Sequence, residues 1–182
     1  MPAKMMLRHV ETSMTDGQTL RMPWWEIDSG ADGPTLMVIA AQHGNEVQGT
    51  EVVRRFAAVC ADEMIGGRAL LVPFGNLPAI RHRRNSVMIG PEEKHTDLHR
   101  KYNMNGQWPG DPEGHDIQRL VHDLYEQLVT RATHVIDLHC WNRFWATATL
   151  ATDDGEGDSR LMGEATGTRF TRWGQPAQPD SL

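Results

Sequence analysis

Residues 35–46 read Thr-Leu-Met-Val-Ile-Ala-Ala-Gln-His-Gly-Asn-Glu, and this stretch decides the fold. Its first seven residues form a continuous apolar run that follows the turn-rich segment 28–34. Such a run is typical of a strand buried on both faces, the kind found in parallel sheets. Apolar residues then recur at spacings of three and four between residues 52 and 64, which predicts a helix capped by the glycines at 66–67.

The segments further along extend this start into an α/β fold. A second buried strand is predicted at residues 69–74, so that strand, helix and strand make a βαβ unit. A helix with one apolar face is predicted at 116–129, and strands follow at 134–139 and 144–150. We therefore expect a mainly parallel or mixed sheet flanked by helices, with the chemistry at the carboxyl ends of its strands.

The expected domain organisation is simple. Residues 1–34 are predicted to form an N-terminal edge strand or hairpin region, and residues 35–182 form the α/β domain itself. The 182 residues suffice for one such domain with a sizeable core.

Composition excludes several classes of protein. With 18 Lys and Arg against 24 Asp and Glu, the formal net charge is −6, which argues against a general nucleic-acid binder. No run approaches about 18 apolar residues, so we expect no membrane-spanning segment. The first ten residues lack the features of a signal peptide. Cys60 and Cys140 make no disulfide framework, which favours a reduced, cytoplasmic compartment.

Two histidines and a glutamate lie where the predicted parallel strands end. His43 and Glu46 follow the first strand, and His139 ends the third strand, 96 residues after His43. The carboxyl ends of parallel strands meet at one edge of a sheet, so these side chains can converge. Two His and one Glu are the protein ligands of catalytic zinc sites that keep a fourth position for water. Asp137 lies on the same side of its strand as His139, where it can support that ligand or lie beside the substrate.

The pattern alone leaves a second interpretation open. H-x-x-E occurs often by chance, and a histidine after a strand is commonly an ordinary polar loop residue. Only the combination, with each group at the carboxyl end of a buried strand, fits the geometry of a metal site.

Four short motifs occur in an order that resembles one enzyme family. They are His43-Gly44-Asn45-Glu46 with Gly49, Asn76 with Pro78 and Ala79, Pro109-Gly110-Asp111-Pro112-Glu113-Gly114, and Asp137-Leu138-His139. The series resembles the succinylglutamate desuccinylase/aspartoacylase family, relatives of the zinc carboxypeptidases, over residues 35–150. The resemblance implies a zinc carboxypeptidase-like fold and one Zn²⁺ per chain, bound by His43, Glu46 and His139. It also implies hydrolysis of an N-acyl amide or related ester of a small carboxylate-bearing substrate, such as an N-acyl amino acid.

The resemblance further implies that arginine and asparagine side chains hold the substrate carboxylate. A guanidinium fork matches a carboxylate in two hydrogen bonds. The family's Asp-x-Asn-Arg pattern fits two registers imperfectly: Asp97-Leu98-His99-Arg100 has His for Asn, and Asn103-Met104-Asn105-Gly106 has Gly for Arg. The sequence also offers arginines at 81, 83 and 84. We predict that Arg84 or Arg100 binds the substrate carboxylate and that Asn105 or His99 adds hydrogen bonds, so the predicted substrate-binding residues are Arg84, Arg100 and Asn105. For the arginines at 81–84, a solvated loop is the alternative.

In this family the general base is a glutamate on a later strand, well beyond the third zinc ligand. Only 43 residues follow His139, and their glutamates are Glu156, in a Gly- and Asp-rich loop, and Glu164, in a polar helix. We therefore expect the base to lie beyond residue 182 and the α/β domain to be incomplete at its C-terminus. On this view the 182 residues bind zinc but turn over poorly.

Two other functions stay open at this point. A zinc carboxypeptidase would use the same ligands on peptides, and a catalytically inactive metal-binding protein or fragment would keep zinc without hydrolysis. The expected partner is a small-molecule carboxylate substrate, with neither nucleic acid nor a membrane. Assembly into a homo-oligomer is left open.

Overall fold

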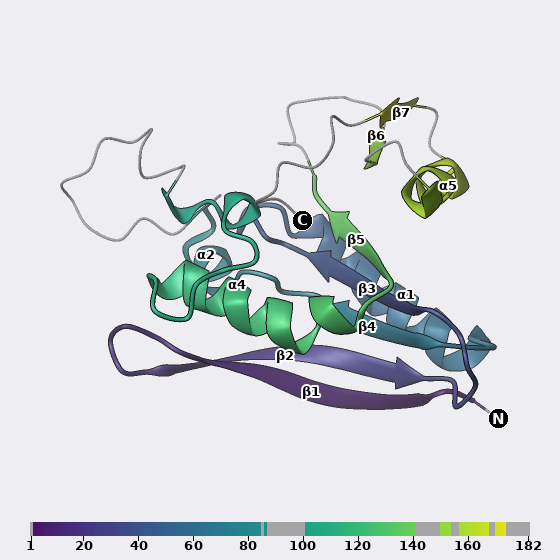
Figure 1. The fold of residues 1–182 in the computed structure, drawn as a ribbon, viewed down its shortest axis with the longest axis horizontal. Coiled ribbons are helices and arrows are strands. Elements are labelled where there is room, and N and C mark those ends of the chain that lie inside the picture. Colours follow the sequence, from purple (N-terminus) through teal and green to yellow (C-terminus); the bar gives the residue numbers. More distant parts are fainter. Residues whose placement is uncertain are drawn as a thin grey trace.

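The apolar run after Pro34 forms a strand with a parallel neighbour on each side. In the computed structural model, which describes residues 2–84, 86, 101–140, 150–153, 157–167 and 170–173, this strand is β3, Thr35–Ala40. Its neighbours are β4, Arg68–Val72, and β5, His134–Leu138, and both run parallel to it (Figure 1). All three predicted strands are confirmed, and their ends differ from the expected ones by at most two residues.

The N-terminal residues form a hairpin that extends this sheet. β1, Lys4–Ser13, pairs antiparallel with β2, Thr19–Asp28, and β2 pairs antiparallel with β4. The strand order is β1-β2-β4-β3-β5, so the sheet is mixed. The hairpin lies within the segment for which an edge strand or hairpin is predicted, whereas the division of the chain at residue 34 stays a prediction.

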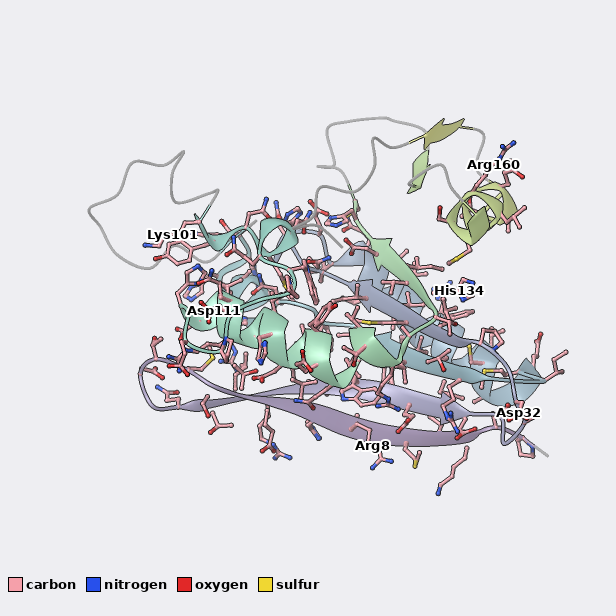
Figure 2. The ribbon with its side chains drawn as sticks, viewed as in Figure 1. Arg8, Asp32, Lys101, Asp111, His134 and Arg160 are labelled. Carbon is pink, nitrogen blue, oxygen red and sulfur yellow. The ribbon has the colours of Figure 1, made fainter. Side chains whose placement is uncertain are left out.

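Helices cover the two faces of the sheet. α1, Gln48–Glu63, packs on one face, and α4, Asp116–Gln127, packs on the other (Figure 1). Figure 2 shows side chains in the space between α4 and the strands of the sheet. The α4 face buries the larger cluster: Val10, Leu20, Met22, Trp24, Met37, Ile39, Leu70, Val72, Met104, Trp108, Ile117, Leu120, Val121, Leu124 and Leu128. The α1 face buries Ile27, Val38, Ala40, Val53, Ala57, Cys60, Ala69 and Leu71. Successive residues of β3 therefore alternate between two buried faces, which explains its unbroken apolar sequence.

The two crossovers end on opposite sides of β3, and this positions the candidate site. The chain passes from β3 through α1 to β4 on one side, and then through α4 to β5 on the other side of β3. In open α/β sheets, ligands bind in the crevice at such a reversal of strand order, outside the carboxyl ends of the strands. The loops that leave β3 and β5 at this reversal contain His43, Glu46 and His139.

Shorter elements complete the described chain. α2, Leu77–His82, follows β4, and two 3-10 turns, η1 (Met104–Gly106) and η2 (Val129–Arg131), flank α4. β6, Leu150–Asp153, pairs in parallel with β7, Phe170–Trp173, and α5, Gly157–Ala165, lies between them in sequence. The strand predicted at 144–150 falls outside the described residues, except for its last position. No helix in the described part of the chain has the length and apolar character needed to span a membrane.

The predicted cap of α1 is wrong. The helix ends at Glu63, and the next residue, Met64, is extended and donates its backbone N–H to the carbonyl of Cys60. Gly67 has a left-handed backbone (φ +77°) and donates its N–H to the carbonyl of Ala31 at 3.0 Å. The left-handed conformation therefore serves the turn that leads into β4 and not the end of the helix.

Gly44 lies directly against the backbone of α2. A Cβ at this position would lie 2.0 Å from the carbonyl carbon of Ala79 and 2.1 Å from its oxygen. Only glycine lets the loop with His43 and Glu46 approach the helix this closely.

Replacing Gly44 with Ala should destabilise the fold, because the added methyl group meets main-chain atoms that cannot rotate away. We expect a lower midpoint of urea unfolding, with a loss of about 1–3 kcal/mol, as for other overpacked sites. Gly106→Ala is the matched control, since a Cβ at Gly106 would meet nothing within 4 Å. Equal midpoints for the two variants would contradict this account of Gly44.

Candidate metal centre

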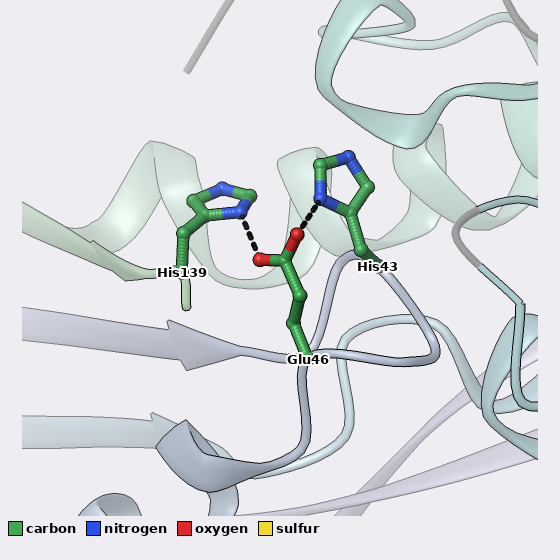
Figure 3. A group of neighbouring side chains, drawn as sticks. All are labelled: His43, Glu46 and His139. Carbon is green, nitrogen blue, oxygen red and sulfur yellow. Dashed lines mark hydrogen bonds and ion pairs between the residues drawn. The ribbon is translucent and has the colours of Figure 1, made fainter. Parts of the chain in front are cut away.

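Glu46 lies between two imidazoles at the carboxyl ends of β3 and β5. Its Oε1 lies 2.8 Å from His43 Nδ1, and its Oε2 lies 2.9 Å from His139 Nδ1 (Figure 3). One ligand atom from each of the three residues lies within 4.8 Å of the other two. The structure therefore brings together the three side chains for which a metal site is predicted.

The loop after β3 turns sharply to present His43 and Glu46. Ala41 is fully buried and has a left-handed backbone (φ 58°), a conformation that is uncommon for residues other than glycine and recurs at functional sites. The backbone N–H of Glu46 donates to the carbonyl of His43 at 3.0 Å, which closes the turn. Asn76 holds the loop from the side of α2, because its Nδ2 donates to the carbonyl of Gln42 at 3.1 Å.

Each histidine has a polar partner on its other ring nitrogen. His43 Nε2 lies 3.0 Å from Asn103 Oδ1, which also accepts from the backbone N–H of Asn105 at 3.2 Å. Because a backbone N–H only donates, the Asn103 atom at this point is its oxygen, and His43 Nε2 donates to it. His139 Nε2 donates to Asp137 Oδ2 at 2.6 Å. Both rings thus direct Nδ1 towards Glu46, and outer partners hold Nε2, as in metal-binding histidines.

The charges of these residues depend on one another. Burial alone would raise the pKa of Glu46, but hydrogen bonds from His139, from His43 and from the backbone N–H of Cys140 outweigh burial and lower this pKa to about 2. Burial likewise disfavours a charged His139, but its hydrogen bonds to Asp137 and Glu46 outweigh burial and raise its pKa to about 10. Without a metal ion, Glu46 is therefore ionised and His139 is protonated at neutral pH.

The three residues fit a divalent metal ion. Two imidazoles and one carboxylate are the donors of catalytic zinc sites. The two carboxylates next to His139, which raise its pKa, also favour a positively charged metal ion at this place. The side chains of His43 and Glu46 are 11% and 16% exposed, and that of His139 is 34% exposed, so the site is open towards solvent on the His139 side. The assignment of the three residues as metal ligands itself stays a prediction.

The predicted substrate-binding residues are placed less completely. Arg84 lies exposed just beyond α2, with its backbone N–H bonded to the carbonyl of Ala79 at 3.2 Å. Arg100 lies outside the described residues. Asn105 is partly buried next to Asn103, and its Oδ1 is buried with no hydrogen-bond partner in the part of the chain that the structure describes. The roles of all three in substrate binding stay predictions.

Sequence reasoning missed Gln42 and Trp108 and did not connect Asn103 with His43. Gln42 is 1% exposed; its Nε2 donates to Asp137 Oδ2 at 2.7 Å, and its Oε1 accepts from Trp108 Nε1 at 3.0 Å. The position of Gln42, a polar residue between an apolar run and a candidate ligand, could have indicated a supporting role in the site. The partners of Gln42 lie 95 and 66 residues away along the chain, so no local pattern identifies them. The contact between Asp137 and His139, in contrast, agrees with the predicted supporting role of Asp137.

Comparison with known proteins relates this site to a family. Residues 32–161 match the family described as "Succinylglutamate desuccinylase/Aspartoacylase catalytic domain", and this range contains all three candidate ligands. Among curated proteins, the N-alpha-acetyl-L-2,4-diaminobutyric acid deacetylase of Halomonas elongata is 30% identical over 138 residues, which are 72% of this chain and 36% of that protein.

Solved structures show the same fold. An aspartoacylase family protein from Mesorhizobium loti has a TM-score of 0.73 at 23% identity, over 92% of this chain and 50% of its own. The product-bound ectoine utilization protein EutE from Ruegeria pomeroyi has a TM-score of 0.71 at 19% identity, over 100% of this chain and 54% of its own. Carboxypeptidase A from Helicoverpa armigera has a TM-score of 0.58 at 11% identity, over 88% of this chain and 47% of its own, and it confirms the predicted carboxypeptidase-like fold class.

The chain spans about half the length of these solved structures and 36% of the deacetylase. The family match covers 32–161 and therefore most of the chain, including the strands that position the site. The order of the motifs and the mixed sheet agree with this match. The chain belongs to the succinylglutamate desuccinylase/aspartoacylase family of hydrolases.

Proposed function

We propose that this chain contains the metal-binding part of a zinc-dependent hydrolase that removes the acyl group from a small N-acyl amino compound bearing a carboxylate. The main support is the Glu46 carboxylate, which contacts an imidazole with each of its oxygens at the carboxyl ends of β3 and β5. The deacetylase from Halomonas elongata is named for an N-acetylated amino acid, and this supports the substrate class.

The residues of the chain have separate tasks in this proposal. Zinc bound by His43, Glu46 and His139 would polarise the scissile carbonyl and lower the pKa of a water molecule. Glu46, with a pKa of about 2, stays ionised across the physiological pH range and supplies a constant negative charge. Asn103 and Asp137 accept from the Nε2 atoms and thereby fix the orientation of both rings.

Substrate recognition is assigned to residues in and around the segment 84–105, of which residues 87–100 lie outside the described part of the chain. Arg84 or Arg100 binds the substrate carboxylate in two hydrogen bonds. Asn105 faces the substrate amide, which is supported by its buried Oδ1, since a buried acceptor requires a donor. The general base stays unassigned: Glu156 lies outside the described residues, and Glu164 is exposed on α5, where it pairs with Arg160 at 3.0 Å.

We also propose a cytoplasmic location. Cys60 and Cys140 are both free thiols, which supports a reducing compartment.

Zinc content tests the ligand assignment directly. The purified chain should retain about one zinc ion per molecule after dialysis. His43→Ala or His139→Ala should reduce the zinc content to background, because a site with three protein ligands loses most of its affinity when one of them is removed. His9→Ala removes an exposed histidine on β1 and should leave the content unchanged. Elemental analysis provides the measurement. Stoichiometric zinc in His139→Ala would refute the assignment.

Zinc affinity should rise with pH. His139 has a raised pKa of about 10 in the metal-free site, so at neutral pH a proton occupies the ring and the metal ion must displace it. Raising the pH favours the unprotonated ring, and the apparent affinity should increase about tenfold per unit between about pH 6 and pH 8. Competition with a chromophoric chelator, corrected for the chelator's own protonation, measures this slope. An affinity that is constant over this range would show that no proton leaves the site on binding.

A substrate panel separates deacylation from peptide hydrolysis. Turnover by this chain should be slow and should favour N-acyl amino acids over short peptides with a free C-terminus. Glu46→Gln should abolish it because the neutral amide is a weak metal ligand. Release of the free amine is followed by a fluorogenic amine reagent. Preferred release of C-terminal residues from peptides would assign the chain to a carboxypeptidase activity instead.

A further inference from the structure

The segment after η1 reaches His139 through a chain of hydrogen-bonded side chains. Trp108 Nε1 donates to Gln42 Oε1 at 3.0 Å, and Gln42 Nε2 donates to Asp137 Oδ2 at 2.7 Å. The same Oδ2 accepts from His139 Nε2 at 2.6 Å. Four residues from three separate parts of the sequence are thus linked, and neither Gln42 nor Trp108 has a place in the mechanism described above.

The direction of each hydrogen bond follows from Trp108. An indole N–H only donates, so the Gln42 atom that faces it is the amide oxygen. The amide nitrogen of Gln42 therefore faces Asp137, and an amide NH₂ group also only donates. Asp137 Oδ2 accepts from Gln42, and as a carboxylate oxygen it accepts from His139 as well. His139 Nε2 consequently keeps its proton, and Nδ1 is the ring nitrogen that remains for a metal ion.

Burial makes this direction difficult to reverse. Gln42 is 1% exposed and Trp108 is 4% exposed, so water is not at hand to replace a lost partner. A rotated Gln42 amide would place its NH₂ group against the indole N–H and its oxygen against the Asp137 carboxylate. Both ends would then be buried without a partner, which is the costly arrangement for polar groups.

We propose that Gln42 and Trp108 are positioning residues that determine which ring nitrogen of His139 binds the metal ion. The inference rests on the proposed metal binding by His139. Gln42 acts through Asp137, and Trp108 acts through Gln42. His43 Nε2 is held separately by Asn103, so the His43 ring is an internal reference whose outer partner does not contact Gln42 or Trp108.

Two variants test the proposal on zinc-loaded, ¹⁵N-labelled protein. Two-bond ¹H–¹⁵N spectra of the imidazoles identify the protonated and the coordinated ring nitrogen, and chelator competition gives the zinc affinity. In the unmodified chain, His43 and His139 should both show protonated Nε2 and coordinated Nδ1.

Gln42→Met keeps the length of the side chain but removes both hydrogen bonds. It should weaken zinc binding about tenfold, as for other outer partners of metal ligands. In the spectra, His139 should show a mixture of protonated Nε2 and protonated Nδ1, whereas His43 should keep protonated Nε2 alone. Trp108→Phe should act in the same direction by a smaller factor.

Trp24→Phe is the matched control. Trp24 and Trp108 belong to the same core cluster and are both 4% exposed, but the indole nitrogen of Trp24 has no hydrogen-bond partner among the described residues. This variant removes the same ring volume without removing a hydrogen bond. Its zinc affinity and imidazole spectra should therefore match those of the unmodified chain.

Three results would overturn the inference. Unchanged affinity and an unchanged His139 pattern in both Gln42→Met and Trp108→Phe would show that these residues do not orient the ring. An equal loss in Trp24→Phe would assign the effect to core packing. If Gln42→Met does not fold, the comparison of zinc affinity and His139 pattern between Trp108→Phe and Trp24→Phe tests the inference. A chain that binds no zinc before any substitution would overturn the metal proposal itself and this inference with it.

Discussion

The parallel pairing of β3 with β5 is the constraint on which the candidate site depends. In this register Ala40 lies opposite Leu138, so the chain leaves both strands at the same edge, and His43 and His139 follow within a few residues. A shift of one residue would turn the partly buried side chains of β5 to the opposite face of the sheet and displace His139. The two hydrophobic clusters therefore do more than stabilise the fold, because they fix the register that brings the imidazoles to Glu46.

Beyond the ends of the strands, hydrogen bonds take over from apolar packing. Gln42, His43 and Asn76 are all buried, and each has a partner on a different segment of the chain. Buried polar groups specify one arrangement because any other leaves some of them unpaired. The cluster is also unevenly charged, since the Glu46 and Asp137 carboxylates share one imidazolium at His139. The site therefore combines a fixed geometry with a surplus of negative charge, and both favour a bound cation.

Local sequence patterns predicted those parts of the molecule that local physics determines. The apolar run of β3 and the one-sided apolar pattern of α4 indicate which faces are buried. The three candidate ligands followed from the rule that the carboxyl ends of parallel strands meet at one edge of a sheet. The rest depends on contacts between distant residues. The glycine at 67 looked like a helix cap, but its conformation is set by the loop at 31–34. Trp108 reaches Gln42 across 66 residues, and nothing in the spacing of either residue indicates the other. The substrate-binding motif is incomplete in both registers, at 97–100 and at 103–106, so its spacing names no single arginine.

The separation of 93 residues between Glu46 and His139 has a consequence for the order of folding. The hairpin of β1 and β2 and the helix α1 form through contacts between near neighbours, whereas docking of β5 on β3 closes a long loop and must overcome its entropy. The three candidate metal ligands are therefore expected to come together late, when the sheet is completed. A metal-dependent signal during refolding would report this last step and not the earlier formation of helices. An ion that recognises only the completed arrangement would chiefly slow unfolding and leave the rate of folding nearly unchanged.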